Sequence, residues 1–268
     1  MDILAQLPGM FGTLSVVQTD WARRIAIEQQ NQGGSFLEPA LVTERGPVSP
    51  GPVFEASYMT GWLLAGTQNQ TGRGLMIGLG SGAGAIGLLH CFPGIDLTVV
   101  EIDPQMVALA TQHFPLIDHF QDLGRLQIVR ADANQFLQDA AGRGESWDFL
   151  VGDAFTGTNH HHCPDDLLHL MTICSQSLWF NVIDNIGGRD LDGLVAKLQR
   201  LDRPCQAFDF RPETPPNVAR NLLVTTQPID PQVADEFEPF QDLDHPNVDQ
   251  VRAQYRSLLA SSVSLQSV

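Results

Sequence analysis

The stretch GLGSGAGAIG, residues 78–87, contains two overlapping glycine patterns that predict different ligands. From Gly78 it reads G-x-G-x-G, the turn that leads a strand into a helix beneath a nucleoside. From Gly82 it reads G-x-G-x-x-G, the dinucleotide fingerprint. Glycines in such a turn let the backbone approach a ligand at the N-terminus of the following helix. The sequence therefore predicts a nucleoside-binding turn whose frame depends on where the strand ends.

The position of the turn and the acidic residue of the next strand favour the first frame. The apolar strand LMI ends just before Gly78, so Gly78, Gly80 and Gly82 fall in the turn and the two later glycines in the helix. Glu101 in TVVEID follows Gly78 by 23 residues, enough for a turn, a helix and a strand. From Gly82 the span is only 19 residues. We interpret the second match as a coincidence at a helix start rich in small residues.

Carboxylates follow two neighbouring strands of this predicted sheet. Glu101 is placed to accept hydrogen bonds from both hydroxyls of a ribose. Asp132, just after LQIVRA, is placed to accept the adenine amino group while the neighbouring N–H of Ala133 meets a ring nitrogen. Taken alone, Asp132 is typical of a helix cap. Together with the glycine turn and Glu101, it predicts an S-adenosyl nucleoside rather than NAD.

A third group of polar residues follows the strand FLVG. Asp153 ends that strand, and GTNHHHCPDD comes directly after it. Consecutive side chains point in different directions, whereas zinc ligands must converge, so no metal is expected. We favour a solvated loop; the alternative is a substrate contact in which His160, His161 or His162 acts as a base. Asp184 in FNVIDN is interpreted as a turn former rather than a ligand contact.

Composition limits the class of protein. The 268 residues carry a formal net charge of −16, which argues against binding nucleic acid through its phosphates. The acidic balance suits a cationic small molecule, but a solvated surface is the simpler interpretation. No apolar run approaches the roughly 20 residues that cross a bilayer, and the N-terminus lacks the pattern of a signal peptide. Four scattered cysteines suit a reducing cytoplasm.

The order of the predicted elements indicates an α/β protein. β-type runs between residues 11 and 42 predict a small antiparallel meander, and the proline-rich residues 44–52 predict a linker. FEASYMTGWLLAG predicts a helix over 54–66. From residue 74 strands and helices alternate, which predicts a Rossmann-like, mainly parallel sheet with helices on both faces. We expect a β-domain with its linker over 1–52, a nucleoside-binding catalytic domain over 53–268, and a frayed tail after Pro228.

Residues 11–227 resemble the spermidine synthase-like branch of class I S-adenosylmethionine-dependent transferases. The motifs LMIGLGSGAG, TVVEIDPQMVALATQHF, LQIVRADANQFL and WDFLVGD carry the resemblance, and the N-terminal meander followed by FEASY extends it. The resemblance implies a homodimer that packs through the meander. It also implies that Asp153 helps to deprotonate the attacking amine and that Tyr58 lines the acceptor pocket. The donor would be held by Gly78, Gly80, Ser81, Gly82, Glu101, Asp132 and Ala133.

The acceptor side departs from the pattern of that family. Ser81 stands where aminopropyltransferases carry an Asp that grips the aminopropyl ammonium, and Thr156, a substrate-side position, stands where they carry a second Asp. Met59 and Thr60 replace a His and a Glu. Carboxylates recognise ammonium groups through strong, charge-assisted hydrogen bonds. We therefore expect at most weak aminopropyl transfer to putrescine or spermidine.

Three functions are compatible with these observations. The first is transfer of a methyl or related alkyl group from S-adenosylmethionine to a small molecule, which the sequence favours. The second is aminopropyl transfer from decarboxylated S-adenosylmethionine to a polyamine. The third is a non-catalytic nucleoside-binding or assembly module. The residues do not name the acceptor; the ligand bound by the protein separates the first two functions from the third.

Overall fold

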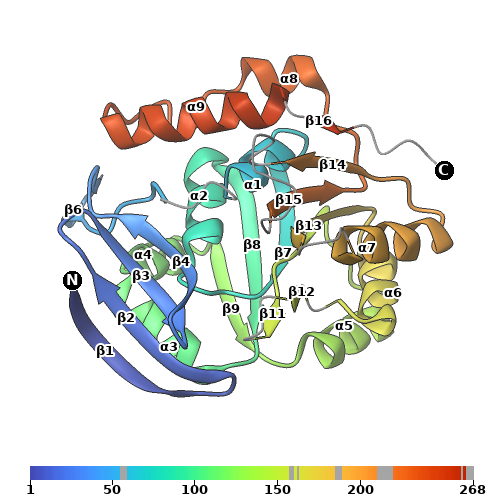
Figure 1. The fold of residues 1–268 in the computed structure, drawn as a ribbon, viewed down its shortest axis with the longest axis horizontal. Helices are drawn as coiled ribbons and strands as arrows, with labels where there is room; N and C mark the ends of the chain where they lie inside the picture. Colours follow the sequence, from blue (N-terminus) through green and yellow to red (C-terminus); the bar gives the residue numbers. More distant parts are fainter. Residues whose placement is uncertain are drawn as a thin grey trace.

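A mixed sheet forms the centre of the molecule (Figure 1). The computed structural model describes residues 1–54, 59–156, 160–161, 163–184, 189–209, 220–260 and 262–263. Within them the sheet has the strand order β16-β14-β15-β13-β10-β7-β8-β9. Strands β13, β10, β7, β8 and β9 run parallel, and β14, β15 and β16 extend the sheet antiparallel. The bounds are β7 (Thr71–Ile77), β8 (Gly94–Glu101), β9 (Leu126–Arg130), β10 (Phe149–Gly152), β13 (Ser177–Asp184), β14 (Gln206–Asp209), β15 (Arg220–Thr225) and β16 (Ser262–Val263).

Helices cover both faces of this sheet, as the alternation of elements predicts. Successive strand residues point to opposite faces, so Leu75 and Ile77 of β7 join one hydrophobic core and Met76 joins the other. The first core includes α5 (Ala133–Gly142), α6 (Asp165–Cys174) and α7 (Arg189–Arg200). The second includes α1 (Met59–Gly66), α2 (Ala83–Cys91), α3 (Pro104–His113) and α4 (Leu116–Asp122). No described helix has the length and apolar character needed to cross a bilayer.

The N-terminal meander is a four-stranded antiparallel sheet, and it begins earlier than the sequence predicts. Its strands are β1 (Asp2–Gly9), β2 (Gly12–Gln18), β3 (Ala22–Ile27) and β4 (Gln30–Phe36). The predicted linker is also structured, since β5 (Leu41–Thr43) and β6 (Gly46–Val48) pair within it. Leu14, Val16 and Ile25 of the meander belong to the same core as α2. The meander therefore packs against α2 and α3, the helices that flank the larger sheet, and the division at residue 52 stays a prediction.

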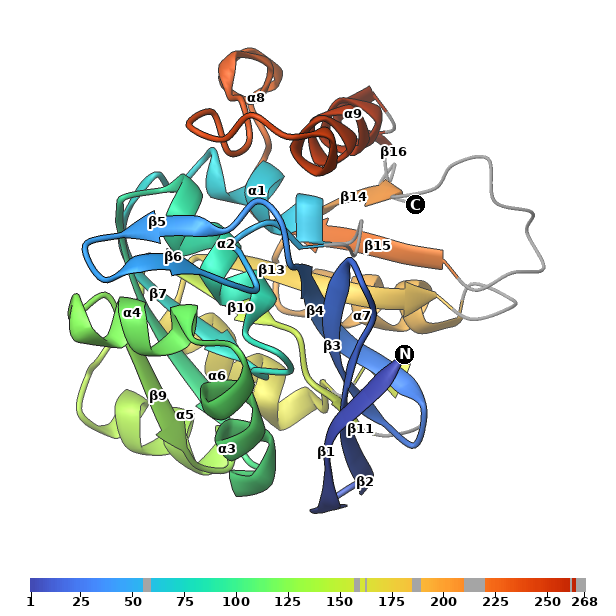
Figure 2. The ribbon, with the colours of Figure 1, turned by 90° about the vertical axis from the view of Figure 1, so that its left-hand side faces the viewer.

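The prediction of a frayed tail after Pro228 is wrong. α8 (Pro231–Glu236) and α9 (Pro246–Ala260) lie side by side along one end of the molecule in both views (Figures 1 and 2). Val248, Val251, Tyr255 and Leu258 of α9 are buried, and α9 contacts α1. Their three- and four-residue spacing gives one apolar stripe. Many acidic and polar residues dilute that stripe in the sequence, which explains the error.

The glycine turn lies where the first frame predicts. Gly78, Gly80 and Gly82 have positive φ angles of 97°, 54° and 76°, a region that glycine enters without the steric cost paid by other residues. Gly82 is the N-cap of α2, and the two later glycines lie inside that helix. A Cβ on Gly87 would lie 2.2 Å from the Phe54 ring, so close packing explains that glycine.

Candidate functional site

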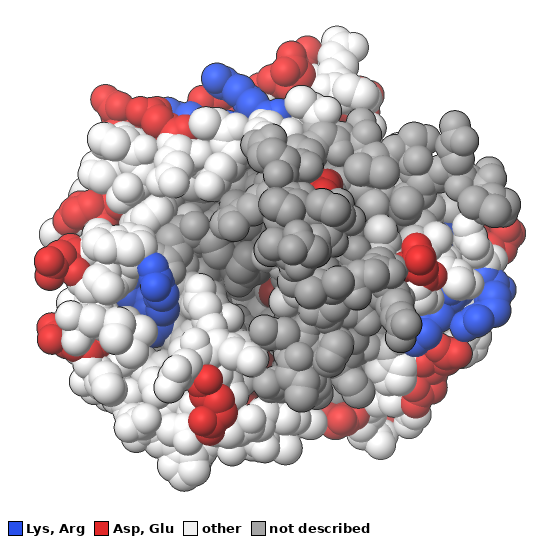
Figure 3. All heavy atoms as spheres, viewed as in Figure 1, with Lys and Arg blue, Asp and Glu red and all other residues white. Residues whose placement is uncertain are grey.

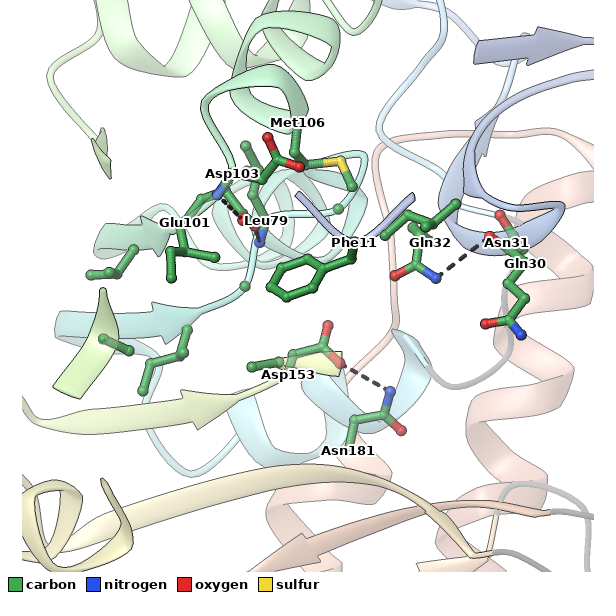
Figure 4. Close-up of a pocket in the computed structure, with 18 of the residues that line it drawn as sticks. Phe11, Gln30, Asn31, Gln32, Leu79, Glu101, Asp103, Met106, Asp153 and Asn181 are labelled. Atoms are coloured by element: carbon green, nitrogen blue, oxygen red, sulfur yellow. Dashed lines mark hydrogen bonds between the residues drawn. The ribbon is translucent and has the colours of Figure 1, made fainter. Parts of the chain in front are cut away.

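A cavity of about 1130 Å³ lies at the carboxyl ends of the parallel strands. In open α/β sheets, ligands bind at this edge. The larger sheet lines the cavity through the glycine turn and the residues that follow β8, β9 and β10. The N-terminal sheet lines it from the opposite side through β3, β4 and the tip of the β1–β2 hairpin. Figure 4 shows side chains of both sheets pointing into this space.

Glu101, the last residue of β8, is buried, and both of its carboxylate oxygens bind backbone. Oε2 accepts the N–H of Leu79 at 2.9 Å, and Oε1 accepts the N–H of Asp103 at 2.9 Å. Burial raises the pKa of Glu101, and the two backbone hydrogen bonds oppose that rise. A carboxylate has about four lone-pair sites, so Glu101 keeps the capacity to accept a hydrogen bond from a ligand. Glu101 thus shapes the glycine turn while it faces the cavity.

Asp103 joins the two sheets beside Glu101. Its Oδ1 caps α3 by accepting the N–H of Gln105 at 2.8 Å, and its Oδ2 accepts the N–H of Met10 at 2.7 Å. Met10 lies at the tip of the β1–β2 hairpin, so this bond anchors the tip over the larger sheet. The next residue, Phe11, points into the cavity between Leu79 and Asp153 (Figure 4). Phe11 therefore lies between the two ends of the cavity.

Asp132 and Ala133 line the cavity beyond β9, and their contact with an adenine stays a prediction. Asp132 is also the helix cap that the simpler interpretation expects, because its Oδ1 accepts the N–H of Gln135 at 3.1 Å at the start of α5. The second oxygen of the carboxylate carries no such bond to α5. One residue thus has a structural role and a place in the cavity.

Gly78 and Gly80 line the cavity, whereas Ser81 and Gly82 are not among its lining residues. The side chain of Ser81 is 1% exposed, and its Oγ accepts the N–H of Ala83 at 3.4 Å. The N–H of Ser81 donates to the carbonyl of Gln32 at 3.3 Å on β4. The turn therefore directs Ser81 toward α2 and the N-terminal sheet, and a contact of Ser81 or Gly82 with the donor stays a prediction.

Asp153 directly follows β10 at the middle of the sheet. Its Oδ1 accepts a hydrogen bond from the Nδ2 of Asn181 at 3.0 Å, and Figure 4 shows both side chains at the edge of the cavity. Burial raises the pKa of Asp153 to about 7, and the hydrogen bond from Asn181 opposes that rise. A carboxyl group that titrates near neutral pH is suited to exchange a proton with a substrate.

The other predicted substrate-side residues are only partly described. Tyr58 and His162 lie outside the described residues. Thr156 lies on β11 (Phe155–Thr156), which pairs with β12 (His160–His161), and only the backbone of this hairpin is described. Asp184 is the last residue of β13, and its side chain likewise lies outside the description. Among the residues that the structure describes, no cluster of three or more His, Cys, Asp or Glu side chains could hold a metal ion.

Several lining residues were missed from the sequence. Asn181 and Asn221 lie within β13 and β15, and a polar residue inside an apolar run such as LWFNVI is the signal that was available. Trp21 and Arg24 come from the N-terminal sheet, where the guanidinium of Arg24 lies 4.9 Å from the Trp21 ring centroid. These residues reach the cavity only because the N-terminal sheet packs against the larger one.

Negative charge dominates the described lining of the cavity. Its described lining includes four acidic residues: Glu101, Asp103, Asp132 and Asp153. Arg24 is the basic residue among the described lining residues. On the described part of the face in Figure 3, Asp and Glu side chains are scattered along the rim rather than gathered in one patch. The acids at the strand ends are therefore a local feature of the cavity that suits a cationic ligand.

Comparisons with known proteins agree with this architecture. No family model matches the chain. A polyamine aminopropyltransferase of Vibrio vulnificus is 33% identical over 100 residues, which span 37% of this chain and 30% of that protein's own length. The structure of a probable spermidine synthase from Corynebacterium glutamicum aligns over all of both chains, with a TM-score of 0.63 and 14% identity. Spermidine synthase from Thermotoga maritima aligns over 94% of this chain and 84% of its own, with a TM-score of 0.57 and 12% identity.

The molecule is thus an α/β protein in which an N-terminal antiparallel sheet covers the strand ends of a Rossmann-like sheet. More narrowly, the chain has the spermidine synthase-like fold. This result confirms, at the level of the fold, the resemblance carried by the glycine turn and the strand-end acids.

Proposed function

We propose that this protein transfers an aminopropyl group from decarboxylated S-adenosylmethionine to an amine. One observation carries the proposal: Glu101 at the end of β8 and Asp153 just after β10 line one cavity. Strand β7, with its glycine turn, lies between those two strands in the sheet. The nucleoside and the nucleophile need separate binding groups that hold them in contact. The two carboxylates supply such a pair.

The donor end would be formed by Glu101, Asp132 and Ala133 with the glycine turn. The remaining acceptor capacity of Glu101 suits the hydroxyls of a ribose. Asp132 and the N–H of Ala133 suit the polar edge of an adenine, and Met106 and Ile102 add apolar surface. The donor supplies an activated sulfonium, so the chain has to position it rather than activate it.

The acceptor end would be centred on Asp153. The amine nitrogen attacks the aminopropyl carbon that is bonded to the sulfonium sulfur. A C–N bond forms, the bond between that carbon and sulfur breaks, and methylthioadenosine leaves. The nitrogen loses one proton, which the Asp153 carboxylate accepts. Asn181 holds that carboxylate in place through the 3.0 Å hydrogen bond, and a pKa near 7 leaves much of Asp153 ionised at neutral pH.

Aminopropyl transfer replaces the preference for methyl transfer drawn from the sequence. The similarity over 100 residues to a polyamine aminopropyltransferase supports aminopropyl transfer. The dimer and the cytoplasmic location stay predictions.

The test is to supply purified protein with each donor and a primary amine, and to measure both thioether products. Release of methylthioadenosine from the decarboxylated donor, lost in Asp153→Asn, supports the proposal. Release of S-adenosylhomocysteine alone from S-adenosylmethionine would replace it with methyl transfer. If calorimetry detects no binding of either donor, the protein is not a transferase of this kind.

A further inference from the structure

The part of the cavity on the far side of Asp153 from Glu101 is lined by neutral amides. In the sheet order, β8 and β9 carry Glu101 and Asp132 on one side of β10, and β13 and β15 follow on the other. The described polar side chains that line the cavity from β13 and β15 are Asn181 and Asn221. Gln30, Asn31 and Gln32 of the N-terminal sheet face the same space (Figure 4).

Asp153, Asn181 and Asn221 form a row across three neighbouring strands. Asn181 is paired with Leu223 and Asn221 with Ile183, so the two asparagines are diagonal neighbours on one face of the antiparallel pair β13–β15. The hydrogen bond from Asn181 to Asp153 continues the row to β10. A substrate amine at Asp153 would therefore extend along Asn181 toward Asn221.

The amides of this row offer hydrogen-bond acceptors to a ligand. The Oδ1 atoms of Asn181 and Asn221 and the Oε1 of Gln30 are buried and have no hydrogen-bond partner among the residues that the structure describes. The orientation of Asn181 is fixed, because its Nδ2 must face the Asp153 carboxylate and its Oδ1 must face the other way. Buried polar atoms are normally paired, so these oxygens mark positions where a bound molecule donates N–H or O–H groups.

We propose that the acceptor is a monoamine with an uncharged hydrogen-bond donor, such as a hydroxyl or a carboxamide, at its far end. This inference rests on the proposed transfer function and specifies its substrate class. The reacting amine occupies Asp153, the one carboxylate of the described row. A second ammonium group would lose its hydration among these amides without gaining a counter-charge from the described residues of β13, β15 and β4, which is costly. A hydroxyl or amide N–H requires only an acceptor oxygen.

The experiment compares three acceptors that share a four-carbon chain: butylamine, 4-aminobutan-1-ol and 1,4-diaminobutane. With saturating decarboxylated donor, methylthioadenosine release gives kcat/KM for each. We expect kcat/KM for the amino alcohol to exceed the values for both other acceptors at least about tenfold, because a site built for a hydroxyl discriminates against analogues that lack it. Equal or higher kcat/KM for the diamine would overturn the proposal.

Two variants of one residue sharpen the test. Asn221→Leu should lower kcat/KM for the amino alcohol to the value for butylamine. Asn221→Asp should raise kcat/KM for the diamine relative to that for the amino alcohol by at least about tenfold, because the new carboxylate adds a counter-charge. Unchanged donor affinity by calorimetry would show that both variants keep the fold. Unchanged acceptor preference in both variants would remove Asn221 from the site and contradict the proposal.

Failure of the proposed function can be separated from failure of this inference. Calorimetry of the three acceptors against protein saturated with methylthioadenosine measures preference without turnover. If no acceptor yields product, aminopropyl transfer is wrong, but tighter binding of the amino alcohol would still support the inference. Tighter binding of the diamine, or no binding of any of the three, would overturn it.

Discussion

The Nδ2 of Asn181 donates a hydrogen bond to the Oδ1 of Asp153 at 3.0 Å, and this contact joins the end of β10 to a buried position of β13. The two residues are 28 positions apart in the chain and become neighbours because β10 and β13 pair in parallel. The contact orients a carboxyl group whose burial raises its pKa to about 7. Two predictions follow from the balance between that burial and this hydrogen bond.

The first prediction concerns the pH dependence of transfer. If Asp153 accepts the proton of the amine, kcat must rise with pH through an inflection near 7, where the carboxyl group ionises. In Asn181→Leu the hydrogen bond that lowers this pKa is lost, so the inflection should move to higher pH. Initial rates between pH 5.5 and 9 measure both profiles. An inflection that stays in place in Asn181→Leu would contradict the role given to Asn181.

The second prediction concerns stability. The pKa of Asp153 is raised from 3.8 to about 7 in the folded protein, so the folded state binds the proton more tightly than the unfolded state. The contribution of Asp153 to stability is therefore greatest below pH 4 and is lost as the pH rises through 7. Asp153→Asn avoids burying the charge and should be more stable than the parent at pH 8.

Thermal unfolding of the two proteins at pH 8 checks this expectation. Each kcal/mol of stabilisation corresponds to a rise of about 2–4 °C in Tm for a chain of this size. The matched control is Asp192→Asn, at an exposed position on α7, which should leave Tm unchanged. A lower Tm for Asp153→Asn than for the parent at pH 8 would show that the carboxylate is stabilised by contacts other than the one from Asn181.

The third prediction separates the two roles of Glu101. Glu101→Ala leaves the buried N–H groups of Leu79 and Asp103 unpaired, and each such loss costs about 1–3 kcal/mol. Glu101→Gln keeps an amide oxygen for one of them and should retain more stability. Both variants should bind the donor at least about tenfold more weakly, because the charged acceptor for the ribose is gone. Calorimetry with unchanged affinity in Glu101→Gln would exclude Glu101 from the donor site.

The fourth prediction tests the contact between the glycine turn and the N-terminal sheet. A Cβ at Gly80 would lie 2.2 Å from the carbonyl oxygen of Gln32, and the φ angle there is +54°. Gly124 has a φ angle of +72° and nothing within 4 Å of its Cβ position. Gly124→Ala therefore matches the backbone strain without the clash. We expect Gly80→Ala to lower Tm and donor affinity more than Gly124→Ala does; equal losses would mean that the contact with Gln32 is unimportant.

The fifth prediction concerns the tip of the β1–β2 hairpin. Phe11 lines the cavity, whereas the neighbouring Met10 side chain is 57% exposed and contributes only its backbone N–H to Asp103. Phe11→Ala should raise KM for the acceptor or the Kd of the donor, because apolar surface in the cavity is lost. Met10→Ala should change neither. If both substitutions have the same effect, the hairpin tip matters only as packing.

Features that depend on short stretches of chain were predictable from the sequence. The glycine turn was assigned to its correct frame because turn, helix and strand follow one another within 24 residues, from Gly78 to Glu101. The strand-end positions of Glu101, Asp132 and Asp153 followed from the same alternation, since parallel strands bring their carboxyl ends to one edge. Asp132 is the helix cap that one interpretation predicted, and it also lines the cavity; its contact with an adenine stays a prediction.

Features that depend on distant segments were decided only by the tertiary structure. α9 was missed because its apolar stripe is recognised only against α1, nearly 200 residues earlier in the chain. The backbone N–H of Ser81 donates to the carbonyl of Gln32 on β4, a contact that no local pattern reveals. Asn181, Asn221 and Phe11 come from three separate segments, and only the pairing of β13 with β15 and the packing of the N-terminal hairpin bring them to one cavity. The sequence by itself determined the sheet edge and its acids through local periodicity, and long-range packing decided which neutral side chains face them.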